Sequence, residues 1–303
     1  MSKVIGIGSA VADTLLEVEK YPAEDTKLEA KKVRRQCGGP CATALVAVSK
    51  LGLDAEYLGT LGDDSNGQYI REQLERFGVR TDCVRMAEGT ASFSSVVLLN
   101  EASASRTCIW NRGNAPEPEL SDVPDGKFSE ADILHLDGHH LGLAIEAAER
   151  MRSLGKKVSL DAGGLYPGIG KLLPLVQILI PSEEFALGFT GESDPVRAAQ
   201  KLEEQFHPEI LIVTQGVRGG FLLEGGKERR YPSFRVKPVD SNGAGDTFHG
   251  AFLAALLKGY KVPEAAEYAS AASAIKCTKF GAQEGIPGDG EVTSFIQSRK
   301  DGQ

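Results

Sequence analysis

The feature that most constrains this chain is the regular alternation of short apolar runs and longer amphipathic runs after Ile133. The apolar runs predict strands over residues 133–136, 157–161, 177–181 and 209–214, and the runs between them predict helices over 142–154, 172–176 and 195–205. Continuous apolar strands that alternate with helices are typical of a parallel sheet covered on both faces. With a first strand over residues 3–8, the sequence predicts a three-layer α/β/α sandwich with a mostly parallel central sheet.

Two stretches do not follow this alternation and predict a second, smaller sheet. Residues 14–35 are charged and alternate in places, and residues 92–110 have the pattern of a hairpin. We expect these strands to form a small β-sheet lid over a substrate cleft. Arg106 and Asn111 are expected near the base of this lid. No low-complexity linker interrupts the sequence, so residues 1–303 are expected to form a single domain.

The composition excludes several kinds of partner. The chain has 34 Lys and Arg against 42 Asp and Glu, a net charge of −8, which argues against nucleic acid or an anionic membrane. Its five cysteines are scattered without a C-x-x-C pair, which favours a reducing compartment. The first apolar run is too short for a signal peptide, and no window reaches transmembrane length, so a cytoplasmic protein is expected.

One glycine turn near the C-terminal end combines an anion site with a carboxylate. Gly243, Ala244 and Gly245 precede apolar residues at helical spacing, so a helix is expected to begin near Gly245. The first amides of a helix lack internal partners and favour anions, phosphate above all. Asp246 would repel that phosphate, and its position is explained if it takes a proton from a substrate hydroxyl. The alternative is an Asp that only stabilises the helix start.

Other polar residues follow predicted strands and should meet at the same sheet edge, where α/β folds bind ligands. Asp13 follows the first strand, and the pair Gly38 and Gly39 leads into a second helix from which Thr43 is expected to face outward. The remaining loops at this edge are Pro181 to Glu184, Thr214 to Gly216, and the pair His139 and His140. This convergence predicts a single site. Asp13 as a turn cap and the histidines as surface-loop residues are the alternatives.

The glycine turn lies in a longer stretch, Asp240 to Asp246, that resembles the D-T-x-G-A-G-D signature of the ribokinase, or PfkB, carbohydrate kinases. Residues 38–44 resemble the first signature of this family, and residues 61–67 resemble the G-x-D-x-x-G that follows it. Within the family, residues 100–107 are similar to ketohexokinase, and residues 213–216, 248–251 and 276–278 are similar to bacterial kinases of fructose-like sugars, including the sulfofructose kinase. The resemblance spans essentially the whole chain and implies a ribokinase-like fold.

The resemblance also implies an ATP-dependent kinase that uses Mg²⁺, with K⁺ as the usual monovalent cation, to phosphorylate a sugar hydroxyl. It carries over these roles: Asp246 as catalytic base; the amides of Gly243, Ala244 and Gly245 as the anion hole; Asp13, Gly38, Gly39 and Thr43 on the sugar; Thr214, Gly216, Lys279 and Gly281 around the nucleotide; and Asp240 on a monovalent cation. Arg106 and Asn111 are further candidates for the sugar, from their expected place near the base of the lid. Lid sheets in this family often serve as dimer surfaces, so a homodimer through the lid is expected.

Three positions depart from the family pattern. Thr43 stands where Asn is common, and Thr cannot make the same bidentate contact, so the sugar is expected to differ. The family's N-x-x-E magnesium motif falls at residues 182–185, where Phe185 cannot hold a magnesium-bound water and Glu183 is the candidate substitute. Gly138 stands where the sulfofructose kinase places an Arg for the sulfonate, which argues against a sulfonated substrate.

The leading hypothesis is an ATP-dependent kinase that acts on a primary hydroxyl of a sugar or sugar-like substrate. A nucleoside kinase of the same fold is the first alternative, with Phe93 and Trp110 as the partners for a base. A non-catalytic sugar or nucleotide sensor is the second, suggested by the altered residues 182–185. A dinucleotide-dependent dehydrogenase is weaker, because the G-A-G turn follows the last strand and not the first.

Overall fold

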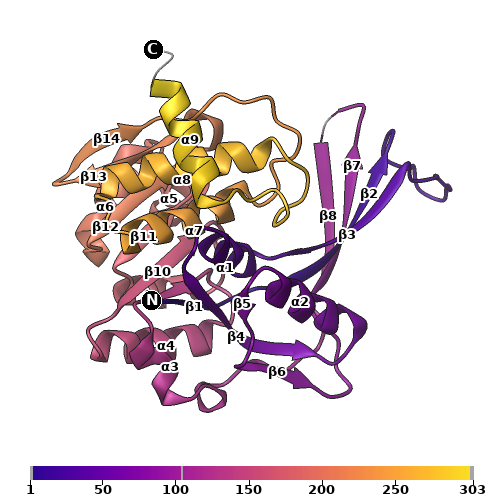
Figure 1. The fold of residues 1–303 in the computed structure, drawn as a ribbon, viewed down its shortest axis with the longest axis horizontal. Helices are drawn as coiled ribbons and strands as arrows, with labels where there is room; N and C mark the ends of the chain where they lie inside the picture. Colours follow the sequence, from indigo (N-terminus) through magenta and orange to yellow (C-terminus); the bar gives the residue numbers. More distant parts are fainter. Residues whose placement is uncertain (1–2, 104, 301–303) are drawn as a thin grey trace.

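The structure, a computed structural model that describes residues 3–103 and 105–300, is built around one ten-stranded sheet (Figure 1). The strands are β1 (Lys3–Ile7), β4 (Asp54–Gly62), β5 (Val79–Arg80), β6 (Val84–Ala87), β9 (Ile133–Leu136), β10 (Lys157–Ala162), β11 (Ile178–Pro181), β12 (Ile210–Thr214), β13 (Gly220–Glu224) and β14 (Lys227–Tyr231). They lie in the order β14-β13-β12-β11-β10-β9-β1-β4-β5, and β6 also pairs with β4. Only the pairings of β13 are antiparallel, so the predicted mostly parallel central sheet is confirmed.

Helices cover both faces of this sheet. They are α1 (Pro40–Lys50), α2 (Ser65–Arg76), α3 (Asp125–Glu130), α4 (Leu141–Ser153), α5 (Glu183–Thr190), α6 (Pro195–Phe206), α7 (Ala244–Leu257), α8 (Val262–Cys277) and α9 (Asp289–Lys300). Successive residues of one strand pack on opposite sides, because Val4 belongs to the apolar cluster with α1, α7 and α8, and Ile5 belongs to the cluster with α4 and α6. The core therefore consists of two apolar layers separated by the sheet, as the sandwich prediction requires.

The direction in which the sheet is built reverses at β1. From β1 the chain proceeds to β4 on one side, and later it returns to place β9 on the other side of β1. The connections therefore leave the carboxyl ends of β1 and β9 in opposite directions. An open α/β sheet binds its ligands in the crevice at such a point, so the candidate site is expected there.

A separate four-stranded sheet, called the lid below, stands off the core (Figure 1). Its strands are β2 (Val11–Val18), β3 (Lys32–Gly38), β7 (Ser94–Asn100) and β8 (Ser105–Asn111), in the order β3-β2-β7-β8. The second sheet predicted from residues 14–35 and 92–110 is confirmed, although β2 begins already at Val11. The segment from residue 19 to residue 31 forms no strand.

The stretch 172–176 is not the helix that its pattern predicts. It lies in two short 3₁₀ turns, Ile169–Lys171 and Leu173–Leu175. Pro174 occupies the second turn, and a proline has no amide hydrogen with which to continue an α-helix. The segment therefore serves as a compact connection between β10 and β11.

The segment after β11 was predicted as a loop, but it becomes α5 at Glu183. The Ser182 hydroxyl accepts a hydrogen bond from the Phe185 amide at 3.0 Å and so caps the helix. Phe185 is buried and stacks on Phe189, one turn further along α5, with ring centroids 5.6 Å apart.

Within residues 3–103 and 105–300, no helix has the length and apolar character needed to span a membrane.

Gly250 is expected to tolerate no side chain. It lies on α7 where this helix packs against α1, and a Cβ atom there would overlap the Ala44 carbonyl oxygen and lie 2.7 Å from the Ala47 Cβ. We expect Gly250→Ala to lower the free energy of unfolding by about 1–3 kcal/mol, because a densely packed interior resists added volume. Chemical denaturation measures this change.

Gly142→Ala on α4 is the matched control, because a Cβ atom there would meet nothing within 4 Å. A Gly→Ala change in an open helix position stabilises by about 0.5–1 kcal/mol. Equal effects of the two substitutions would contradict the close packing of α1 and α7.

Candidate active site

A buried carboxylate, Asp137, ties together the elements at the switch point of the sheet. It follows β9, and its Oδ2 accepts hydrogen bonds from the Ser9 amide (2.8 Å), the Ser9 hydroxyl (2.9 Å) and the Cys41 amide (3.1 Å). Its Oδ1 accepts one from the His139 amide at 3.0 Å. Burial alone would raise the pKa of Asp137, but hydrogen bonds from His139 and Ser9 hold it below its usual range. The carboxylate is therefore charged and fixes β1, β9 and α1 around the crevice.

A second buried carboxylate, Asp161, anchors the helix that carries the glycine turn. It is the last residue but one of β10, and its Oδ1 lies 3.2 Å from His249 Nε2. His249 is on α7, one turn after Asp246. The first turns of α7 are thereby held against the carboxyl end of the sheet.

Asp246 lies in the first turn of α7, as the sequence predicts, and its side chain is partly exposed. Burial raises its pKa to about 7, and the neighbouring Asp161 carboxylate adds to this rise, whereas His249 opposes it. A carboxylate with a pKa near neutrality can exchange a proton with a substrate at physiological pH, which is the property of a general base.

The glycine turn before Asp246 has the shape that an anion site requires. Gly243 caps α7 with a φ of 77°, a left-handed conformation that favours glycine. A Cβ atom at Gly243 would lie 3.0 Å from the Ala282 Cβ, so the turn packs closely on the segment after α8. Gly245 is exposed, and a Cβ atom there would meet nothing within 4 Å, so the first turn is open on this side. The Ala244 amide donates to the Ser241 carbonyl oxygen at 3.2 Å, so the amides that follow it in the first turn are the ones with room for an anion.

Asp13 and the paired glycines form the other half of the site. Asp13 on β2 is buried, its Oδ1 accepts a hydrogen bond from the Ser95 hydroxyl at 2.6 Å, and burial raises its pKa. A Cβ atom at Gly38 would overlap the Asp13 carboxylate, and one at Gly39, whose φ is 95°, would lie 2.8 Å from the Ser9 carbonyl carbon. The glycines are thus required by the packing of this half, whether or not they touch a ligand.

Contacts with the segment after α8 join the two halves. Gln36 is paired with Asp13 across β2 and β3, and its Oε1 accepts a hydrogen bond from the Ala282 amide at 3.2 Å. Ala282 is also the residue on which Gly243 packs. The structure therefore brings Asp13, the paired glycines and the glycine turn of α7 into one contiguous site.

Two predicted sugar-binding residues, Thr43 and Asn111, are placed differently. Thr43 does not face outward: it is fully buried in α1, which lies between the sheet and α7, and its Oγ1 is 3.5 Å from Gln283 Nε2. Asn111 is one register step beyond Trp110, so it points to the opposite face of the lid from Asp13, and its Oδ1 accepts a hydrogen bond from the Gly113 amide. The side chain of Arg106 lies outside the described part of the chain.

The predicted nucleotide residues at the ends of β11 and β12 come together. Thr214 is bridged to Ser182, and Gly216, with a φ of 57°, begins a 3₁₀ turn. Glu183 is engaged by its neighbours, because its Oε1 accepts a hydrogen bond from Gln215 Nε2 at 2.9 Å and its Oε2 is paired with Arg218. Both oxygens of this carboxylate therefore have partners within the chain.

The segment after α8 holds the remaining candidates. The Gly281 amide donates to Asp240 Oδ2 at 2.9 Å, so Asp240 and Gly281 are brought together. The Lys279 ammonium is paired with Glu291 on α9 at 2.7 Å, which directs it toward that helix.

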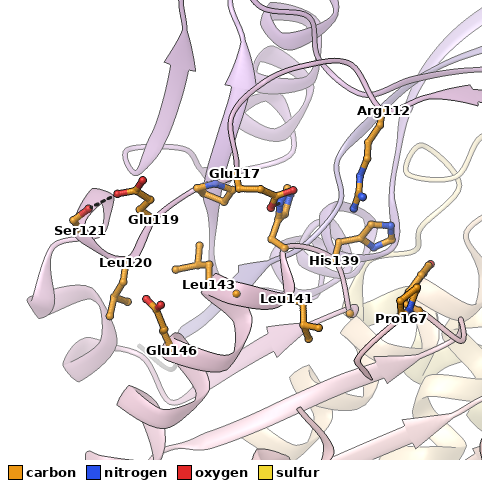
Figure 2. Close-up of a pocket in the computed structure, with 15 residues that line it drawn as sticks. Arg112, Glu117, Glu119, Leu120, Ser121, His139, Leu141, Leu143, Glu146 and Pro167 are labelled. Carbon is orange, nitrogen blue, oxygen red and sulfur yellow. Dashed lines mark hydrogen bonds and ion pairs between the residues drawn. The ribbon is translucent and has the colours of Figure 1, made fainter. Parts of the chain in front are cut away.

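A cavity of about 740 Å³ opens beside the carboxylates. Arg112, which follows β8, and His139, which follows β9, both line it, and Figure 2 shows these two side chains pointing toward one another. Asp246 and the glycine turn do not line the cavity. Tyr166 lies in the wall of the cavity, and burial, followed by the nearby Asp137, raises its pKa.

Sequence reasoning missed Asp137 and Asp161. Both stand directly at the carboxyl ends of buried strands, in the same position as other residues that were predicted to meet at this edge. That position is the signal that could have identified them.

The chain is similar over its whole length to known kinases. The sequence pattern of the pfkB family carbohydrate kinases matches residues 1–289. The ribokinase of Haemophilus influenzae is 27% identical over 298 residues, which are 96% of this chain and 97% of that protein. The ATP-dependent ribose-1-phosphate kinase of Halopiger xanaduensis is 28% identical over 304 residues, which are 99% of this chain and 100% of that protein. The structure of Arabidopsis thaliana ribokinase complexed with ribose and ATP has a TM-score of 0.87 and 27% identity, with 98% of both chains covered.

The central sheet, the separate four-stranded sheet and the carboxylate at the start of α7 agree with a phosphotransferase of the ribokinase-like fold. The chain belongs to the pfkB family of carbohydrate kinases, as its signatures predict. It is an ATP-dependent sugar kinase of this family. The finer likeness to ketohexokinase and the sulfofructose kinase stays a prediction.

Proposed function

We propose that this kinase transfers the γ-phosphoryl group of ATP to a primary hydroxyl of a sugar, with Asp246 as the general base. The observation that carries the proposal is the Asp246 carboxylate itself, which is partly exposed at the start of α7 with a pKa raised by burial to about 7. Such a group removes a proton from an alcohol as the alcohol attacks phosphorus. The amides from Gly243 to Gly245 would stabilise the charge that develops on the phosphoryl oxygens.

We assign the sugar to the half of the site around Asp13. A buried carboxylate whose second oxygen lies against Gly38 can accept hydrogen bonds from sugar hydroxyls while Ser95 holds its first oxygen. A primary hydroxyl is the least crowded alcohol of a sugar, so it can enter the gap between Asp246 and the phosphate most readily. The Arabidopsis ribokinase complexed with ribose and ATP supports a sugar in this class of site.

The nucleotide is assigned to the edge formed by Thr214, Gly216 and Gly281. We propose that Mg²⁺ enters with ATP, because Mg²⁺ retains water and substrate phosphate oxygens as most of its ligands. Glu183 does not fit as its holder, since Gln215 and Arg218 occupy that carboxylate. Among residues 3–103 and 105–300, no group of three or more His, Cys, Asp and Glu side chains could hold a metal ion. No step is therefore assigned to a protein-bound metal.

A substrate panel tests the proposed function. The protein with Mg-ATP is offered aldopentoses, ketohexoses, sugar phosphates and nucleosides, and ADP release is followed together with ³¹P NMR of the product. One class of sugar is expected to raise ADP release by about 10²-fold or more over the rate with water as the only acceptor, since a positioned alcohol reacts faster. The phosphate ester should lie on a primary carbon. ADP release that no sugar increases would contradict the proposal.

A nucleoside kinase is the second candidate, and a row of aromatic rings favours it. Trp110 and Phe93 meet edge to face at 5.8 Å, Phe93 lies 6.4 Å from the His139 ring, and that ring lies 4.6 Å from Tyr166. These rings lead from the lid into the 740 Å³ cavity, where a base could stack. Turnover with a nucleoside that exceeds turnover with every free sugar would establish this candidate.

We also propose that the chain forms a homodimer through its lid. Val33, Val96 and Ile109 lie on the face of the lid opposite to Asp13, and they are 65%, 38% and 62% exposed. Exposed apolar side chains gathered on one sheet face are typical of an interface.

We expect Ile109→Glu to convert a dimer to a monomer, because a charge would be buried at that interface. Light scattering coupled to size-exclusion chromatography measures the mass. Leu154→Glu, at an exposed apolar position that follows α4, is the control and should leave the mass unchanged. A wild-type monomer at micromolar concentration would contradict the proposal.

A further inference from the structure

A fully buried ammonium lies beside the glycine turn. Lys276, near the end of α8, is 0% exposed, and its Nζ donates a hydrogen bond to the Asp240 carbonyl oxygen at 2.8 Å. The same Nζ lies 4.0 Å from Asp240 Oδ1. A lysine is almost never fully buried unless its charge is compensated. Its place next to the phosphate-binding turn therefore calls for a functional explanation.

The monovalent cation implied by the family resemblance does not fit the oxygens of Asp240. The carboxylate Oδ1 accepts a hydrogen bond from the Asn242 amide at 2.8 Å, and Oδ2 accepts one from the Gly281 amide at 2.9 Å. The carbonyl oxygen is taken by Lys276. A cation such as K⁺ binds through oxygen atoms, and here it would also meet the like charge of the ammonium. Asp240 is thus already neutralised from within the chain.

We propose that the Lys276 ammonium takes the place of the monovalent cation, so that this kinase works without K⁺. Lys276 is a positioning residue: it touches Asp240 and acts on the anion hole through it. The claim that turnover is independent of K⁺ rests on the proposed function. The claim that the protein binds no K⁺ at Asp240 does not, because it concerns the protein without substrate.

Backbone contacts connect the segment of Lys276 to the anion hole. The amides of Val239 and Asp240 both donate to the Cys277 carbonyl oxygen, at 2.7 and 3.2 Å. Asp240 is thereby held at three points by the segment that begins with Lys276. Gly243, three residues further on, packs on Ala282 of the same segment. A fixed cation at Asp240 therefore sets the position of the turn whose amides receive the phosphoryl group.

The first test uses the wild-type protein and needs no substrate. Its melting temperature is measured in KCl, NaCl and choline chloride at equal ionic strength. Without a cation site, the three values should agree within about 1 °C. A rise that is specific to K⁺ and grows with its concentration would overturn the inference. Turnover with the sugar found in the panel should likewise differ by less than about twofold between the three salts, and a K⁺ activation of about tenfold or more would overturn it.

The second test replaces the ammonium with an apolar side chain of similar length. In choline chloride, Lys276→Met is expected to lower kcat by about tenfold or more while the KM for the sugar changes little, because a displaced anion hole affects the transition state. K⁺ or NH₄⁺ should restore part of this loss and should now raise the melting temperature of the variant. Loss of activity that neither ion restores, or no loss at all, would refute the replacement of the cation.

Lys258→Met is the matched control, because Lys258 follows α7 and is paired with Asp289, at the end of the helix remote from the glycine turn. It should show no response to K⁺. If Lys276→Met does not fold, the wild-type melting series still decides the question. If no sugar is phosphorylated, the proposed function fails while that series remains valid.

Discussion

Asp246→Asn is expected to lower kcat by about 10²–10⁴-fold, the range that general-base catalysis contributes. Asparagine keeps the size and the helix-start position of the side chain, but it cannot take the proton of the sugar hydroxyl. Binding of Mg-ATP should be retained, because removal of a negative charge beside the phosphates does not weaken it. Steady-state kinetics and calorimetric titration with a non-hydrolysable ATP analogue measure the two quantities separately.

Asp64→Asn is the matched control for this substitution. Asp64 caps α2, where its Oδ1 accepts a hydrogen bond from the Gly67 amide at 2.8 Å, so it is a helix-start carboxylate without a catalytic assignment. We expect its kcat to stay within about twofold of the wild-type value. If Asp246→Asn retains turnover within about tenfold of the wild type, Asp246 is not the base.

The pH dependence follows from the pKa of Asp246, which is about 7. The base acts in its deprotonated form, so kcat/KM should rise about tenfold per pH unit below pH 7 and level off above it.

The same pKa affects stability. Because the pKa of Asp246 in the folded state lies above its ordinary value of 3.8, the folded state binds the proton more tightly than the unfolded state does. The contribution of Asp246 to stability therefore falls as the pH rises between these two values.

Glu56→Gln is expected to lower the free energy of unfolding by about 3–5 kcal/mol, because it breaks a buried ion pair by removing one partner. Glu56 on β4 is fully buried, its Oε2 lies 2.7 Å from Lys3 Nζ, and its Oε1 lies 2.6 Å from Lys127 Nζ. The substitution leaves the equally buried Lys3 next to a neutral side chain. Urea denaturation at pH 7 measures the loss.

Glu130→Gln is the control, because Glu130 lies 3.5 Å from the same Lys3 ammonium but is mostly exposed. An exposed ion pair contributes about 0–1 kcal/mol. Burial would raise the pKa of Glu56, but Lys127 and Lys3 hold it below its ordinary value of 4.5. Its stabilisation is thus present above that value and is lost as the pH falls through the folded pKa. Equal losses for the two variants at pH 7 would contradict the buried pair.

The site residues that could be predicted from the sequence are close together along the chain. The turn from Gly243 to Gly245, the carboxylate of Asp246 and the start of α7 are contiguous, so spacing and helix geometry suffice to predict them. The alternation after Ile133 likewise predicts the layers of the fold, because it depends on the period of each element.

The residues that sequence reasoning missed depend on contacts between segments that are far apart along the chain. Asp137 accepts hydrogen bonds from Ser9 and Cys41, which are 128 and 96 residues away along the chain. The contact of Lys276 with Asp240 exists only because α8 packs beside Asp240 in the folded chain. A single sequence carries no direct signal for such pairs.

Side-chain direction was the other source of error. Thr43 was expected to face outward from the first turn of its helix, but α1 is enclosed by the sheet on one side and by α7 on the other, so this polar residue is buried. In the lid, the strands were predictable but the register was not. One register step separates Trp110, on the face of Asp13, from Asn111 on the opposite face.

A ternary crystal structure with the identified sugar and a non-hydrolysable ATP analogue tests the central claim most directly. The acceptor hydroxyl should lie within about 3.2 Å of an Asp246 carboxylate oxygen and about 3–3.5 Å from the γ-phosphorus, in line with the leaving oxygen. The γ-phosphate oxygens should receive hydrogen bonds from the first amides of α7. A sugar whose acceptor hydroxyl faces the γ-phosphorus without contact to Asp246 would contradict the claim that this carboxylate takes the proton.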